Sequence, residues 1–287
     1  MQRLTLLLLV GALFLPGASI SGPREKPIIQ WVDIILPPFH HIESGPWQGQ
    51  GITDNIIALM KHKLPEFQQQ HEILSGELAI RWLKQKPNVC VAAFKKTADR
   101  QSYLYFSLPS VFVPPNGIWV RRQEVSQFGE SPVSLGKLIE QGELRLGFDE
   151  TRSYGSGIDT LLSKYQKQDN LYGISTLNSS ERLLKMMSRR RIDYALGYPL
   201  ELGFLSESMQ MPQAFRFLPL RETGNYSFSH IACSRTPQGK RIIAAINRVL
   251  LSERPTAHYR SFTERWLDVA ILPEYWSDYR TEFANAP

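Results

Sequence analysis

Apolar and polar positions along the chain alternate between short strand-like runs and amphipathic helices. An apolar run over residues 27–36 has strand length and stops at two prolines, which a central strand does not accommodate. Residues 53–64 then repeat apolar positions at the i, i+3, i+4 spacing of a helix. A strand near 71–74, a helix capped by Ser75 and a strand over 89–94 follow. This alternation predicts a parallel sheet covered by helices.

The middle of the chain repeats the same alternation. Strand-like runs at residues 143–148, 171–176 and 192–196 alternate with helical spacing at 155–166 and 179–187. The remaining segments are a strand near 229–234 and helices at about 238–252 and 256–269. The repeat predicts a second sheet of the same kind.

Two segments rich in Pro, Gly, Asn and Ser, residues 111–117 and 222–229, bracket this second set. They predict two crossings between two lobes. The first lobe is discontinuous, residues 22–113 plus 228–287, and the second, residues 114–227, is inserted into it. We therefore predict an α/β fold of two lobes, each a mostly parallel sheet flanked by helices, with two crossover strands at a hinge. Loops that follow the strands would then converge on a cleft where a small ligand binds.

Residues 1–21 have the three-part layout of a secretory signal peptide. A short basic start precedes an apolar run over residues 4–15, and small residues with candidate cleavage points after Ser19 or Ser21 come next. A membrane span needs about 20 apolar residues, so this run is too short to be one. We expect cleavage and a mature protein in the periplasm; a retained membrane anchor is the alternative.

Composition narrows the function classes. The chain has 287 residues, of which 43% are hydrophobic and 21% charged, and these values exclude disordered and fibrous proteins. The net charge of +6 is modest, and the basic run 189–191 falls at a predicted helix end, where cations offset the helix dipole. We therefore expect no nucleic-acid partner. Without a nucleophile elbow, paired acid motif or metal-binding helix in the sequence, we also expect neither an enzyme, nor a metal, nor a cofactor.

The cysteines Cys90 and Cys233 are too few for a disulfide scaffold and lack the spacing of a zinc site. In an oxidising compartment two such thiols favour a bridge. A bridge requires the strands that carry them to be neighbours. The alternative is two buried thiols that act as small hydrophobic side chains.

Three stretches of the chain carry a resemblance to a known family: residues 33–39 followed by Gly51, residues 97–100 followed by 105–109, and residues 191–196. In this order, from residue 27 to 269, they resemble the bacterial solute-binding proteins of the polar-amino-acid class (family 3, type II periplasmic binding fold). The resemblance implies a monomeric periplasmic receptor for amino-acid transport. It would close like a Venus flytrap on a small carboxylate-bearing ligand, amino-acid-like or an organic acid, and present it to an ABC importer permease or a membrane sensor. A periplasmic enzyme of the same fold, such as a dehydratase acting on a small acid, is the alternative.

Arg100 is the candidate for binding the ligand carboxylate. It lies one turn into a helix that starts near Thr97, where free backbone N–H groups already attract an anion. A guanidinium adds a planar fork matched to a carboxylate, and the family's carboxylate-binding Arg falls here. An ion pair with Asp99 is the alternative. Thr97 has two possible roles, as the helix cap or also as a ligand contact.

The loop 151–157 and several loop aromatics complete the predicted site. The small residues of the loop let backbone N–H groups approach an acceptor, and the family's ligand contacts there point to Tyr154, Gly155 and Ser156. An ordinary strand-to-helix turn is the alternative. The candidate aromatic walls are Phe39, Trp47 and Tyr198, and of these we choose Phe39 and Tyr198. Asp33 matches an acidic cleft residue of some family members, or is a satisfied strand-end Asp.

The sequence departs from the family at two places. Gly197 and Tyr198 stand where amino-acid binders carry an Asp for the ligand ammonium, which argues against a standard α-amino acid. Glu201 is a possible substitute, or else it faces solvent. Lys95 and Lys96 precede Thr97 and would suit extra negative charge on the ligand, unless both point outward. The neighbours His40 and His41 face opposite sides of an extended chain, which argues against a joint metal site.

Overall fold

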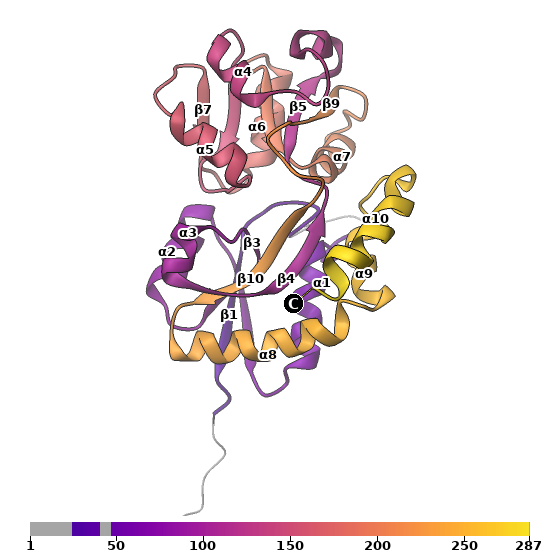
Figure 1. Cartoon of the computed structure of the whole chain (residues 1–287). Helices are drawn as coiled ribbons and strands as arrows, with labels where there is room; N and C mark the ends of the chain where they lie inside the picture. The colour runs from indigo at the N-terminus through magenta and orange to yellow at the C-terminus, as the bar shows by residue number, and fades with distance from the viewer. Residues whose placement is uncertain (1–24, 41–46, 287) are drawn as a thin grey trace, which may run out of the picture.

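The computed structural model describes residues 25–40 and 47–286 and shows two α/β lobes joined by two extended segments (Figure 1). The predicted signal peptide and His41 lie outside the described residues. No helix in the described ranges is both long and apolar enough to cross a bilayer.

The first lobe contains a five-stranded sheet in the order β2-β1-β3-β10-β4. Its elements are β1 (Ile28–Asp33), α1 (Ile52–Lys63), β2 (Gln68–Ile73), α2 (Gly76–Gln85), β3 (Val89–Phe94), α3 (Ala98–Tyr103), β4 (Leu104–Val113), β10 (Ser227–Ser234), α8 (Pro237–Glu253), α9 (Ala257–Glu264), η2 (Val269–Ile271), α10 (Leu272–Asp278) and η3 (Tyr279–Ala284). Both ends of the described chain therefore build one lobe.

The second lobe contains the other sheet, in the order β7-β6-β8-β5-β9. Its elements are β5 (Gly117–Arg121), η1 (Arg122–Phe128), α4 (Leu135–Gln141), β6 (Leu146–Asp149), α5 (Ser156–Lys164), β7 (Leu171–Ile174), α6 (Ser179–Ser188), β8 (Tyr194–Gly197), α7 (Pro199–Ser208) and β9 (Phe215–Pro219). The two sheets have the same strand pattern.

One strand in each sheet, β10 or β5, runs antiparallel to its two neighbours, and the other pairings are parallel. Helices flank both sheets, so the predicted two-lobed α/β class is confirmed. The chain leaves the first sheet after β4 and returns to it at β10, and these two strands run side by side toward the second lobe (Figure 1). The lobe limits 22–113 plus 228–287 and 114–227 remain our proposal.

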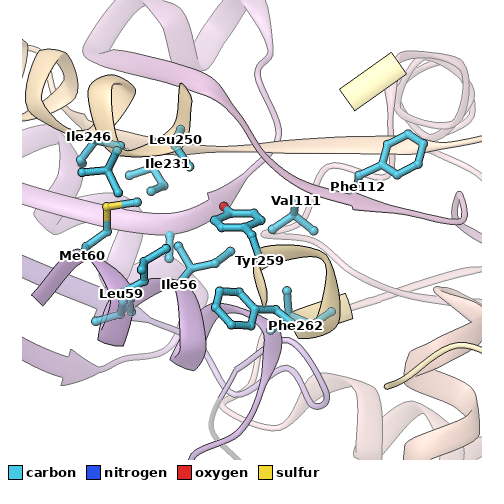
Figure 2. Close-up of a cluster of buried hydrophobic side chains, with 14 of the residues drawn as sticks. Ile56, Leu59, Met60, Val111, Phe112, Ile231, Ile246, Leu250, Tyr259 and Phe262 are labelled. Atoms are coloured by element: carbon cyan, nitrogen blue, oxygen red, sulfur yellow. The ribbon is translucent and has the colours of Figure 1, made fainter. Parts of the chain in front are cut away.

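The core of the first lobe lies between its sheet and helices α1, α8 and α9. The apolar faces of these helices meet side chains from β4 and β10, with Ile56, Met60, Ile231 and Ile246 fully buried (Figure 2). Apolar positions recur on α1 and α8 at the spacing of one helix face, because that face covers the sheet. The strands β4 and β10, which lead to the second lobe, are thus anchored in this core.

The disulfide expected in the first lobe is present between Cys90 and Cys233. Cys90 on β3 stands opposite Cys233 on the neighbouring strand β10, with their Cα atoms 4.1 Å apart. Both residues are fully buried. The bridge thus joins residues separated by 143 positions, on either side of the inserted lobe.

Aromatic side chains from the C-terminal segment pack against the hinge. Phe112 on β4 stacks on Tyr226 at 4.3 Å between ring centroids and on Phe283 at 5.5 Å. The Tyr275 hydroxyl donates to the Phe112 carbonyl oxygen over 3.1 Å. The last helices of the chain therefore pack against both segments that join the lobes, at Phe112 and at Tyr226.

Candidate functional site

A cavity of about 80 Å³ lies where the two lobes meet. The first lobe lines it with residues that follow or cover β1 and β3, and the second with residues that follow β6 and β8. The polar and aromatic lining residues are Phe39, His40, Phe94, Lys95, Arg100, Thr151, Arg152, Ser153, Tyr198 and Ser229. The space holds a few water molecules, so the lobes are closed on each other. A larger ligand would enter only through an open form.

Arg100 reaches into this cavity from the first turn of α3. Thr97 caps the helix by accepting from the Arg100 backbone N–H over 3.3 Å. The guanidinium packs over the Phe94 ring and donates to the carbonyl oxygens of Lys95 and Thr151, each over 3.2 Å. The second of these bonds crosses from one lobe to the other.

The charge of Arg100 has no counter-ion among the residues that the structure describes, because no carboxylate lies within 4.0 Å of its guanidinium. The alternative ion pair with Asp99 is therefore not formed. Arg100 is 7% exposed, and burial lowers the pKa of its guanidinium. A buried cation without a carboxylate beside it gains more from an anion than a solvated cation does.

On the second lobe, Arg152 and Glu201 form a buried ion pair. Nη1 of Arg152 lies 2.9 Å from Oε1 of Glu201, and Nη2 lies 3.2 Å from Oε2. The Ser180 hydroxyl and the Tyr198 backbone N–H also donate to this carboxylate. Burial alone would lower the pKa of Arg152, but the Glu201 carboxylate raises it. Glu201 is fully buried and Arg152 lines the cavity, so the guanidinium faces the ligand space.

Phe39 and Tyr198 meet across the cavity with ring centroids 5.0 Å apart. The Tyr198 hydroxyl lies 3.2 Å from the Ser227 hydroxyl on β10, and Lys95 donates to the same Ser227 oxygen and to the Phe228 carbonyl. Burial alone would raise the pKa of Tyr198, but the Lys95 ammonium and these hydrogen bonds lower it. These contacts place the two chosen aromatics and Lys95 together at the cavity.

Backbone contacts hold Phe39 in position. The Phe39 carbonyl accepts from both the backbone N–H and the hydroxyl of Thr53 at the start of α1. A Cβ on Gly51 would lie 2.6 Å from the same carbonyl oxygen, so only glycine permits this close approach. Trp47, the third loop aromatic, packs instead against Trp266 at 5.5 Å and does not line the cavity.

Asp33 lies outside the cavity lining and is held by two histidines. Its carboxylate oxygens lie 3.1 Å from His40 Nε2 and 2.7 Å from His71 Nε2, and the residue is 1% exposed. Burial alone would raise the pKa of Asp33, but both imidazoles lower it. These contacts fit the alternative interpretation of Asp33, an aspartate at a strand end whose carboxylate is held by neighbouring side chains. In the described ranges, no three His, Cys, Asp or Glu side chains are placed to hold a metal ion.

The loop after β6 does not form the predicted anion cradle. The Tyr154 backbone N–H donates to Asp159 in the first turn of α5 over 2.8 Å, and the buried Tyr154 hydroxyl accepts from the Asp149 N–H. Gly155, at φ +107°, is the N-cap of α5, and Ser156 is the first residue of the helix. Tyr154, Gly155 and Ser156 line a separate hollow beside the hinge. The ordinary-turn alternative fits them better.

Thr151, Arg152 and Ser153 face the cavity from the same loop, three residues earlier than the sequence analysis placed the contacts. A usable signal exists, because β6 ends at Asp149 and the carboxyl ends of the strands face the cleft. Gly76, at the start of α2, touches Thr151 across the lobes: a Cβ on Gly76 would overlap the Thr151 hydroxyl and lie 2.9 Å from its Cβ. Gly76 was not among the residues predicted from the sequence.

Comparison with solved structures gives the same architecture. A histidine kinase sensor domain similar to periplasmic binding proteins matches with a TM-score of 0.66 and 14% identity, over 85% of this chain and 98% of that one. A putative L-cystine ABC transporter from Listeria monocytogenes matches with a TM-score of 0.66 and 11% identity, over 85% and 97%. The substrate-binding protein of an amino acid ABC transporter matches with a TM-score of 0.60 and 16% identity, over 84% and 99%.

At these identities the likeness establishes the fold, that of the two-lobed periplasmic binding proteins. No protein-family model matches the chain, and neither does any curated protein.

Proposed function

We propose that this protein is a periplasmic receptor that captures a small carboxylate-bearing solute between its lobes. The observation that carries the proposal is Arg100, a buried cation in the interlobe cavity whose guanidinium donates to two backbone carbonyls. Phe39, Lys95 and Tyr198 complete the contacts around it. A ligand held by residues of both lobes binds the closed form better than the open form, and so shifts the hinge toward closure.

The closed complex would then be presented to a membrane partner. The comparisons include proteins of ABC importers and a sensor domain of a histidine kinase, which support both an importer permease and a membrane sensor as that partner. We propose a monomer without cofactor or metal. Residues 1–21 would direct it to the periplasm as a cleavable signal peptide, and the protein would bind its ligand rather than transform it.

A thermal-shift screen of amino acids, organic acids and small peptides tests the proposal. A ligand at 100 times its Kd adds about 2.7 kcal/mol of stability. We expect Arg100→Met to weaken the best ligand at least about 30-fold, because leaving one partner of a buried charge pair alone costs roughly 2–5 kcal/mol. Arg216→Met is the matched control, because Arg216 is exposed on the distant strand β9.

Two outcomes would contradict the proposal. Equal loss of binding in Arg100→Met and Arg216→Met would show that Arg100 does not bind the ligand. Mass spectrometry of the ligand after incubation separates receptor from enzyme: consumption of the bound acid would favour the enzyme alternative.

A further inference from the structure

The charge of the cavity is one-sided. Lys95, Arg100 and Arg152 line it, and no Asp or Glu is found among the lining residues that the structure describes. Two acidic side chains that contact lining residues already have partners: Asp33 is held by two histidines and Glu201 by Arg152. A ligand ammonium would therefore enter a desolvated space that is lined by the cations Lys95 and Arg100 and by no carboxylate, which is costly.

The ion pair of Arg152 with Glu201 contributes to the preference of the cavity for an anion over an ammonium group. Glu201 accepts from Arg152 through both oxygens and also from Ser180 and the Tyr198 N–H, so its lone pairs are used. The carboxylate is 0% exposed, whereas the guanidinium lies on the cavity wall. The second lobe thus presents a cation to the ligand.

Arg100 and Lys95 both line the cavity and both keep N–H groups for an anion. Arg100 donates to two carbonyls and keeps further N–H groups of its five. Lys95 donates to the Ser227 hydroxyl and the Phe228 carbonyl, which leaves one of its three N–H groups. Apolar side chains, among them Leu36, Phe39 and Ile80, line the same cavity. A short carbon chain with an anion at each end matches this arrangement.

We propose that the ligand is a small dicarboxylate without an ammonium group. One carboxylate binds Arg100, and the other binds Lys95 and the N–H groups of Arg152 that Glu201 leaves unused. This inference rests on the proposed capture function and narrows it.

Isothermal titration with matched acids tests the inference. Glutarate and glutamate differ by one amino group, as do succinate and aspartate, and butyrate lacks the second carboxylate of succinate. We expect each dicarboxylate to bind at least tenfold more tightly than its amino acid partner, and succinate to bind at least tenfold more tightly than butyrate. Binding of glutamate or aspartate as tight as that of its partner overturns the inference and leaves the capture function standing. If no acid of this panel or of the wider screen binds, both fail.

Two variants test the role assigned to the ion pair. Arg152→Ser frees the Glu201 carboxylate toward the cavity, and we expect the affinity ratio of glutarate to glutamate to fall at least tenfold. The double variant Arg152→Met with Glu201→Leu removes both charges without an unpaired buried one, and we expect that ratio to fall at least threefold. Circular dichroism checks that each variant is folded. A ratio unchanged in the folded double variant would refute the assignment.

Discussion

Gly76→Ala should open the protein without unfolding it. The methyl group would overlap the Thr151 hydroxyl and lie 2.9 Å from Thr151 Cβ, and this contact exists only where the lobes meet. Overpacking a tight contact costs about 1–3 kcal/mol, so the closed population should fall about 5- to 150-fold relative to the open one. The apparent Kd of the best acid from the screen should rise by the same factor, because binding requires closure.

Small-angle X-ray scattering with ligand present measures the opening, because Gly76→Ala should then have a larger radius of gyration than the wild type. The free energy of unfolding in urea should stay within about 0.5 kcal/mol of the wild type, since the open form relieves the clash. The compensating double variant Gly76→Ala with Thr151→Gly should close and bind as the wild type does. If Gly76→Ala alone keeps the wild-type radius and affinity, or if it loses stability while staying closed, the reasoning is refuted.

Three further results are expected. Reduction of the Cys90–Cys233 bridge should cost up to about 5 kcal/mol of unfolding free energy in urea, from the loop entropy of 143 residues, and no loss would refute that account. Thr97→Ala should lose about 1 kcal/mol of stability as a lost helix cap, with ligand affinity changed less than threefold. The hydrogen bond to Asp33 raises the pKa of His71 above 6.5. The pair therefore stabilises the protein fully below pH 6.5, and this stability is lost as the pH rises through the raised pKa. On the acid side, the pKa of Asp33 is lowered, so the stability is lost only as the pH falls below 4 through that lowered pKa. His71→Gln should therefore flatten the stability profile between pH 6 and 8, and an unchanged slope would count against the pair.

Much of the first lobe could be predicted because its local signals agree. The helix periods, the cap at Ser75 and the strand lengths all indicated one architecture, and the structure has Ser75 accepting from the Leu78 N–H as expected. Arg100 could be placed because its distance from the Thr97 cap is set by helix geometry alone. Such features depend on residues close together in sequence.

The orientation of the loop after β6 could not be predicted. Tyr154 turns inward because Asp159, five residues later, accepts its N–H and the Ser153 hydroxyl. The ion pair joins Arg152, on the loop after β6, with Glu201, which lies 49 positions later in the first turn of α7. Nothing in either local pattern specifies that partner, so the analysis left Glu201 open between ligand contact and solvent.

Several elements of the second lobe also escaped the pattern. Apolar residues of α7 are spread around the helix, so no single stripe marks it, although Pro199 at its first position is a start signal. All five residues of β5 are buried, and a short continuous apolar run does not distinguish strand from helix. Tertiary packing decides such segments.

The bridge between β3 and β10 turns the chain into a covalent ring that contains the entire second lobe and both hinge segments. A protease that nicks any loop of that lobe would leave the two fragments attached to each other until a reductant is present. The strand β3, which leads into the helix that carries Arg100, and the returning strand β10 would still be joined covalently after such a cut. The position of the two sulfur atoms along the chain thus decides which single cuts leave the fragments joined.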